Sequence, residues 1–271
     1  MSKYKVLALD LDGTLTNTQK IITPRTKAAL AAAAKAGTRI LLASGRPTVG
    51  IRPLAEELDL ASSGGYILSY NGGKITNCAT GEVPVEIRFP SPYIEELCAF
   101  AREHEVTILT YDDRGIVTES PEDHYVKVEC MINKIQAYGV KDLVKYVNYP
   151  VNKFLLAGEP EKLASLEPLL AKQFEGRLSV YRSMPYFLEA MPLGVDKAAS
   201  LERLLTTLGL TPENLMACGD GWNDKGMIQL AGMGVAMANA VPEVKAVANF
   251  ITLDNDHDGV GLAIEKFILS E

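Results

Sequence analysis

The chain of 271 residues has only three histidines and four cysteines, and this scarcity argues against several kinds of site. Its cysteines lie far apart and form no CxxC pair: Cys78, Cys98, Cys130 and Cys218. They are expected to be reduced structural thiols, not zinc ligands. None of the histidines has a suitably placed serine or cysteine motif beside it, which disfavours a hydrolase built on a catalytic triad.

Long apolar runs and an excess of positive charge are also lacking. No apolar run approaches the ~18 residues that a membrane helix requires. The N-terminal segment lacks the basic-then-apolar pattern of a secretion signal. A net charge of −7 argues against a general surface for nucleic acid or anionic membranes. We therefore expect a cytoplasmic protein that binds neither, long enough for one large or two modest domains.

The most informative stretch is an apolar run that ends in two carboxylates. Val6, Leu7, Ala8 and Leu9 read as a strand buried on both faces, and Asp10 follows at its carboxyl end. Asp12 lies two residues on, so in extended backbone both carboxylates would point the same way and repel each other. A hard divalent cation such as Mg²⁺ would resolve that conflict. The alternative is a solvated turn after a strand.

Strands and helices alternate in the two outer portions of the chain. Strands are expected at 6–9, 39–43, 66–70, 214–218, 234–237 and 250–252, and helices at 24–36, 47–58, 195–208, 242–248 and 259–269. Asn71-Gly72 is a strong hairpin signal after the third strand. This alternation predicts an α/β core with a doubly wound, parallel, Rossmann-like sheet, formed by residues 1–83 and 193–271.

The pattern changes between these portions. Strands are expected at 83–89, 106–111, 115–118, 151–157 and 178–183, and helices at 92–105, 140–146 and 160–173. This is an α+β pattern bracketed by prolines, so residues 84–192 are predicted to form an inserted second domain.

Two further polar clusters follow predicted strands, Ser44-Gly45-Arg46 and Gly219-Asp220-Gly221-Trp222-Asn223-Asp224. They should converge on the first cluster if the first and fourth core strands are neighbours. Asp220 would then join Asp10 and Asp12 around the cation, and Asp224 would hold a metal-bound water or support the shell. Asn223 offers an amide to an anion, and Lys197 a positive charge.

These residues resemble a known family. The clusters around Asp10, Ser44, Lys197 and Asp220 match, in order, the four motifs of the haloacid dehalogenase superfamily. The hairpin, the insertion after it and the Gly-Asp-x-x-Asn-Asp form are similar to its Cof-type phosphatases. The resemblance spans essentially the whole chain, although within the insertion it is one of layout only. Lys225 departs from the pattern, because an apolar residue is expected there.

The resemblance implies a phosphatase that acts on a small phosphorylated metabolite, most simply a sugar phosphate. Asp10 would form an aspartyl-phosphate, and Asp12 would act as general acid and base. Asp10, the backbone carbonyl of Asp12, and Asp220 would hold Mg²⁺, with Asp224 in support. The groups expected to cradle the phosphoryl oxygens are Ser44, Lys197, Asn223 and backbone N–H groups near Leu11 and Gly45. The inserted domain would act as a cap that supplies selectivity.

Other interpretations stay open at this point. A phosphotransferase or mutase would use the same aspartyl-phosphate, and a regulatory domain would keep it as a signal. A catalytically inactive binding protein is a third alternative. Taken alone, Lys197 would be a solvated lysine, Ser44 a helix N-cap and Asn71 a turn residue, whereas Arg46 would pair with a local carboxylate. Trp222 would serve packing or contact a lid.

Overall fold

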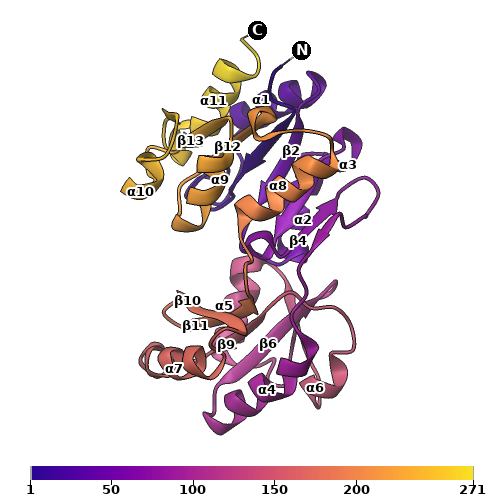
Figure 1. Ribbon diagram of the computed structural model, residues 1–271, viewed down its shortest axis with the longest axis vertical. Coiled ribbons are helices and arrows are strands. Elements are labelled where there is room, and N and C mark those ends of the chain that lie inside the picture. The colour runs from indigo at the N-terminus through magenta and orange to yellow at the C-terminus, as the bar shows by residue number, and fades with distance from the viewer. Residues whose placement is uncertain (1, 271) are drawn as a thin grey trace. The chain divides into compact units, whose positions relative to one another are not determined.

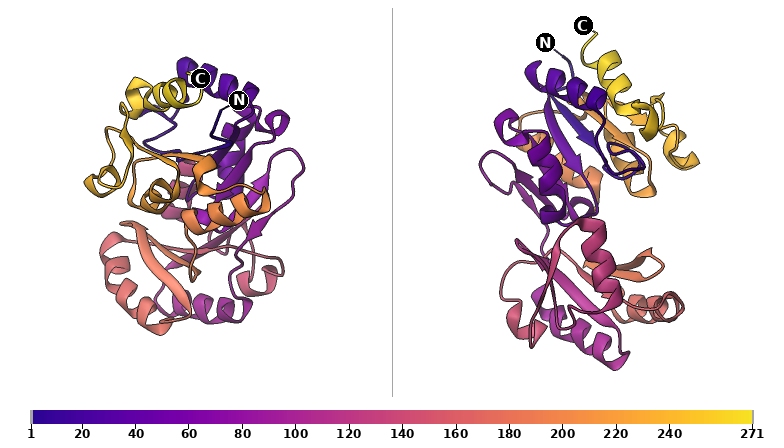
Figure 2. Two further views of the ribbon diagram at one scale, coloured as in Figure 1. Left: turned by 45° about the horizontal axis from the view of Figure 1, so that its top comes forward. Right: turned by 180° about the vertical axis from the view of Figure 1, so that it is seen from behind.

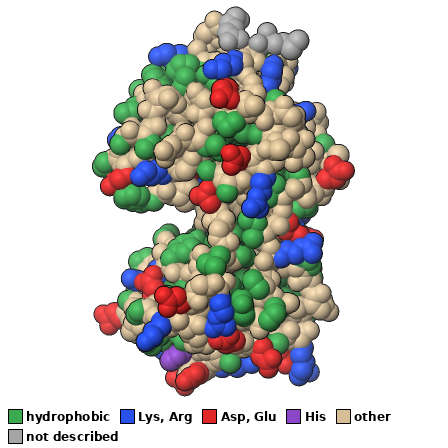
Figure 3. All heavy atoms as spheres, viewed as in Figure 1, with side chains coloured by type: hydrophobic (Ala, Val, Ile, Leu, Met, Phe, Trp, Pro, Cys, Tyr) green, Lys and Arg blue, Asp and Glu red, His purple; other side chains and the backbone are tan. Residues whose placement is uncertain are grey.

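The computed structural model describes residues 2–270 and divides them into two compact units, each with its own sheet (Figure 1). The first unit contains the chain up to Arg46, Ile51–Val85, and the chain from Asp196 onward. The second contains Pro47–Gly50 and Glu86–Val195. Among the described residues, no helix is both long and apolar enough to cross a membrane. On the face drawn in Figure 3, basic side chains are scattered among acidic ones.

An eight-stranded sheet forms the centre of the first unit, in the order β14-β13-β12-β1-β2-β3-β4-β5. Its strands are β1 (Val6–Leu9), β2 (Arg39–Ala43), β3 (Tyr66–Ser69), β4 (Lys74–Asn77), β5 (Val85–Glu86), β12 (Leu215–Gly219), β13 (Met233–Ala236) and β14 (Phe250–Ile251). The pairs from β14 to β3 are parallel, and β4 returns antiparallel to β3 as the hairpin signal predicts.

The order of strands reverses between β1 and β12. From β1 the chain moves outward through β2 and β3, whereas from β12 it moves through β13 and β14 in the other direction. The prediction that the first and fourth core strands are neighbours is therefore confirmed. Open α/β sheets bind ligands at this switch point, outside the carboxyl ends of the strands.

Helices cover both faces of this sheet. They are α1 (Pro24–Lys35), α2 (Thr48–Glu57), α3 (Leu60–Ser63), α8 (Lys197–Thr207), α9 (Lys225–Leu230), α10 (Pro242–Lys245) and α11 (Gly259–Phe267), with the short 3-10 helices η1 (Tyr70–Gly72), η3 (Pro212–Asn214), η4 (Trp222–Asp224) and η5 (Asn255–His257). Helix α1 packs against α11 on one face, and α8 against α9 on the other (Figure 2). All residues of β1 and β12 are buried between these layers, which confirms the doubly wound α/β class.

The second unit is built on a six-stranded sheet in the order β10-β11-β9-β6-β7-β8. Its strands are β6 (Thr107–Asp112), β7 (Gly115–Thr118), β8 (Gln136–Gly139), β9 (Phe154–Ala157), β10 (Leu178–Met184) and β11 (Phe187–Pro192). All pairs are antiparallel except β7 with β8. The helices are α4 (Ile94–Glu103), α5 (His124–Asn133), α6 (Leu143–Tyr146) and α7 (Pro160–Gln173), with the 3-10 helix η2 (Ser91–Tyr93).

Several expected elements differ from the structure. Helix α5 and the strands β8 and β11 were not predicted, and the expected strand at 83–89 forms only over Val85–Glu86. The expected helix at 140–146 forms only over Leu143–Tyr146. Helix α5 contains β-branched residues of modest helix propensity, which hid it from the periodicity analysis. The overlooked signal was Asp123, whose side chain accepts hydrogen bonds from two backbone N–H groups as an N-cap.

Candidate active site

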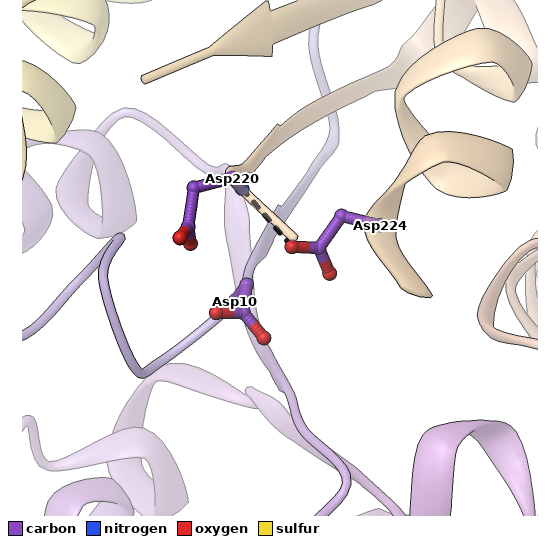
Figure 4. Close-up of side chains that lie close together, drawn as sticks. All are labelled: Asp10, Asp220 and Asp224. Carbon is purple, nitrogen blue, oxygen red and sulfur yellow. Dashed lines mark hydrogen bonds between the residues drawn. The ribbon is translucent and has the colours of Figure 1, made fainter. Parts of the chain in front are cut away.

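Asp10 and Asp220 are brought together because β1 and β12 are parallel neighbours that end side by side. The register pairs Leu9 with Cys218, and the Asp10 N–H donates to the Cys218 carbonyl at 3.0 Å. With Asp224 they form a cluster of three carboxylates, drawn in Figure 4. One carboxylate oxygen from each of the three residues lies within 4.8 Å of the other two. The predicted convergence of carboxylates at the switch point is present for these three residues.

The turn after β1 shapes the surroundings of Asp220. Gly13 has a φ of +87°, and a Cβ at that position would lie 2.4 Å from Asp220 Oδ2. The Thr14 hydroxyl donates to Asp220 Oδ1 at 2.6 Å. Glycine is therefore required for the approach of the two loops, and Thr14 fixes the orientation of the carboxylate.

Lys197 is buried at the start of α8, with 1% of its surface exposed. Its Nζ donates to Asp10 Oδ1 at 2.8 Å, to Asp224 Oδ1 at 2.7 Å and to the Ala43 carbonyl at 3.0 Å. Burial opposes the charge, but the carboxylates of Asp10 and Asp224 hold the pKa of Lys197 above its ordinary value. The solvated interpretation of this lysine is therefore wrong.

Asp224 is completely buried and is engaged through both of its oxygens. Oδ1 accepts from Lys197, and Oδ2 accepts from the backbone N–H groups of Asp220 at 3.0 Å and Gly221 at 2.9 Å. These contacts favour the supporting role among the two that the sequence left open, because they shape the loop that carries Asp220.

The site holds more negative than positive charge. Three carboxylates face the single ammonium of Lys197. Burial, reinforced by Asp224, raises the pKa of Asp10 to about 8. Burial also raises the pKa of Asp220 to about 6, with Asp224 adding to the shift and the Thr14 hydrogen bond opposing it. A group of oxygen donors with unbalanced negative charge fits a hard divalent cation such as Mg²⁺.

Asp12 lies apart from this cluster of three carboxylates. Strand β1 ends at Leu9 and a turn follows, so the expectation of extended backbone from Asp10 to Asp12 is wrong. Arg46 donates to Asp12 Oδ2 from Nε at 2.9 Å and to Oδ1 from Nη2 at 2.7 Å, and Lys20 Nζ donates to Oδ1 at 2.8 Å. Although burial favours its neutral form, these hydrogen bonds hold the pKa of Asp12 below its ordinary value. Arg46 pairs with a local carboxylate, as predicted.

The remaining predicted residues lie in the loops after β1, β2 and β12. Ser44 Oγ accepts from the Arg46 N–H at 3.2 Å, so it stabilises its own turn and is not the N-cap of α2. Gly45 lies in the same turn. In the loop after β1, the Leu11 carbonyl accepts a hydrogen bond from the Thr16 N–H at 2.9 Å.

Asn223 follows β12 and donates from Nδ2 to Asn71 Oδ1 at 3.0 Å. The sequence identified Asn71 only as a turn residue, which it is, at a φ of +55°. Its contact with Asn223 could not be inferred from a spacing of 152 residues. Trp222 is 62% exposed, so packing does not explain this tryptophan. Lys225 is the first residue of α9.

The doubly wound core and its cluster of three carboxylates agree with the similarity of the chain to known phosphatases. The chain is an enzyme that hydrolyses phosphate monoesters. More specifically, the chain belongs to the haloacid dehalogenase-like hydrolases, because the model of that family matches residues 7–264. The predicted family is thereby confirmed, including its Cof-type branch.

Individual relatives cover nearly the whole chain. It is 30% identical over 269 residues to the 5-amino-6-(5-phospho-D-ribitylamino)uracil phosphatase YcsE of Bacillus subtilis, a match that covers 98% of this chain and 96% of that protein. A haloacid dehalogenase-like hydrolase from Bacteroides thetaiotaomicron has 48% identity and a TM-score of 0.94, with 97% and 99% of the two chains covered. The subclass IIB sugar phosphatase BT4131 has 25% identity and a TM-score of 0.77, with 97% and 98% covered.

Proposed function

We propose that this hydrolase is a Mg²⁺-dependent phosphatase that dephosphorylates small phosphorylated metabolites, sugar phosphates foremost, through an aspartyl-phosphate on Asp10. The observation that carries the proposal is the environment of Asp10. Its carboxylate is buried at the switch point, is held by Lys197 at 2.8 Å, and lies beside Asp220. A nucleophile needs such a fixed orientation, and the charge of Lys197 opposes the rise in the pKa of Asp10 that burial causes.

In the first step, a carboxylate oxygen of Asp10 forms a bond to phosphorus and the ester P–O bond breaks. The departing oxygen takes a proton from Asp12. In the second step, a water oxygen bonds to phosphorus, Asp12 takes the proton of that water, and the bond from phosphorus to Asp10 breaks. Inorganic phosphate leaves, and both side chains return to their starting states.

Asp12 suits these two steps unequally in the structure. Arg46 and Lys20 favour its ionised form, which is the form that accepts a proton in the second step. For the first step Asp12 must carry a proton when the ester is bound, so its contacts with the two cations must weaken at that stage.

The chain's own oxygens would hold the cation. Asp10, Asp220 and the backbone carbonyl of Asp12 are the proposed ligands, and Asp224 supports them through the loop of Asp220. Mg²⁺ bound there would supply positive charge to the phosphoryl group during transfer. We assign the phosphoryl oxygens to Ser44, Lys197, Asn223 and the backbone N–H groups near Leu11 and Gly45.

The preference for sugar phosphates is supported by the likeness to the sugar phosphatase BT4131. The motif residues would bind only the phosphoryl group, which all phosphate esters share. Selectivity among esters must therefore come from other side chains, and we assign it to the second unit.

The test is a screen of phosphorylated metabolites for release of inorganic phosphate in the presence of Mg²⁺ and without any acceptor alcohol. Sugar phosphates should release phosphate at multiple turnovers, and the Asp10→Asn variant should release none. A phosphotransferase or mutase would release phosphate slowly and pass it instead to an added sugar. Stable phosphorylation of Asp10 lasting hours would indicate a regulatory domain and overturn the proposal.

A further inference from the structure

The 3-10 helix η1 (Tyr70–Gly72) is bonded to one of the loops of the candidate site. The Asn71 N–H donates to the Ser44 carbonyl at 3.0 Å, and the Tyr70 N–H donates to the Arg46 carbonyl at 3.0 Å. A Cβ on Gly45 would lie 3.1 Å from the side chain of Asn71. The turn is therefore packed directly on the loop that follows β2.

The same turn is bonded to the helix that carries Lys197. Ser200 Oγ donates to the Gly72 carbonyl at 2.7 Å. A Cβ on Gly72 would lie 2.4 Å from the Asp196 carbonyl oxygen, so the backbone of the turn lies against the first residues of α8. This turn thus has little freedom to move relative to Lys197.

The third connection is the hydrogen bond from Asn223 Nδ2 to Asn71 Oδ1. Asn71 adopts φ +55° and ψ +27°, a left-handed conformation that asparagine tolerates better than most side chains. The Asn223 Oδ1 lies on the opposite side of its carboxamide, 2.8 Å from where a Cβ on Gly221 would be. One turn is therefore bonded to the loop of Ser44, the helix of Lys197 and the side chain of Asn223.

We propose that Asn71 is a positioning residue that fixes the carboxamide of Asn223 with its amide group toward the phosphoryl oxygens. The proposal rests on the proposed function. A carboxamide presents donors on one side and an acceptor on the other, and the two have nearly the same shape. Turned the wrong way, Asn223 would face the anion with its carbonyl oxygen. Asn71 Oδ1 accepts one of the two amide protons, which selects the correct orientation and leaves the second proton for the anion.

The test uses Asn71→Gly, which removes the acceptor while keeping a residue suited to positive φ. Asp59→Gly is the matched control, because Asp59 also has a positive φ, of 49°, and its side chain accepts one hydrogen bond, from Ser62. Two quantities are measured with Mg²⁺ present, the KM of several phosphate esters and the affinity for inorganic phosphate. The second is followed by the fluorescence of Trp222, the chain's single tryptophan, which is exposed beside Asn223.

We expect Asn71→Gly to raise KM for all esters and to weaken phosphate binding by about tenfold, with kcat changed much less. Asp59→Gly should leave both unchanged. In an Asn223→Ala background, Asn71→Gly should add no further loss, because it acts through Asn223. The positioning role would be overturned if Asn71→Gly weakened phosphate binding equally in the wild type and in the Asn223→Ala background. Unchanged phosphate binding in Asn71→Gly would overturn it as well. A wild-type protein that neither turns over nor binds phosphate would overturn the proposed function as well.

Discussion

The Nζ of Lys197 lies 2.8 Å from Oδ1 of Asp10, with both side chains buried at the end of β1. The same ammonium also binds Asp224, so one positive charge serves two carboxylates from different loops. This arrangement explains why the three residues belong together, and it leads to tests that separate catalytic roles from structural ones.

Replacing Asp10 with asparagine should abolish turnover and preserve the fold. Asparagine keeps the size of the side chain but cannot attack phosphorus, and loss of a nucleophile costs several orders of magnitude in rate. Phosphate release and the thermal midpoint should be measured on the same preparation. A folded Asp10→Asn protein with full activity would disprove the mechanism.

The Asp12→Asn variant should lose more activity on alkyl phosphates than on activated aryl phosphates. A poor leaving group needs the proton of the general acid, whereas an aryl oxide leaves without it. Rapid-mixing measurements of the first half-reaction compare the two ester types directly. Equal losses for both would show that Asp12 is not the general acid.

Lys197→Met should weaken the binding of all phosphate esters to the same extent and should also destabilise the protein. Removing one partner of a buried ion pair costs about 3–5 kcal/mol, because Asp10 and Asp224 would be left without their cation. Lys153→Met is a matched control, since Lys153 is a buried lysine of the second unit, 3.1 Å from Glu189. Urea unfolding should show a lower free energy of unfolding in both variants. An effect of Lys197→Met on only one ester would contradict a role at the shared phosphoryl group.

Chelation should remove activity, and Mg²⁺ or Mn²⁺ should restore it, whereas Ca²⁺ should inhibit because it prefers looser and larger coordination. Mg²⁺ should also raise the thermal midpoint of the wild type, since a ligand that binds the folded state stabilises it. Asp220→Asn should lose most of that increase. Undiminished activity after thorough chelation would exclude the assignment.

Without metal, stability should fall as the pH rises from about 4 to about 8. Burial raises the pKa of Asp10 to about 8 and that of Asp220 to about 6, above their ordinary value of 3.8. In this window the folded protein binds more protons than the unfolded chain, so the free energy of unfolding decreases with pH. The lowered pKa of Asp12 has the opposite effect, but only at more acidic pH.

Urea unfolding in chelator at several pH values measures this slope, and saturating Mg²⁺ at pH 8 should recover the lost stability. Asp10→Asn, which has no titrating group at that position, should flatten the upper part of the slope. A slope that is unchanged in Asp10→Asn would show that other groups cause it.

The sequence by itself was sufficient for the core of the fold and for the loops that form the site. An apolar run such as 6–9 that ends in carboxylates is a local pattern, and the rule that parallel strands end at one edge converts it into a location. Asp10 and Asp220 could be placed together in this way, whereas Lys197, which begins helix α8, was placed with them only by the family resemblance. Helix α5 was not predicted, because its β-branched residues have modest helix propensity and the N-cap signal of Asp123 was overlooked.

Only the tertiary structure decided which partner each polar side chain has. The pairs Arg46 with Asp12 and Asn71 with Asn223 join residues 34 and 152 positions apart. The complete burial of Asp224 likewise depends on Lys197 and the loop of Asp220. Hydrogen bonds act over about 3 Å, so such pairings depend on the path of each turn and the packing between elements, neither of which a one-dimensional pattern specifies.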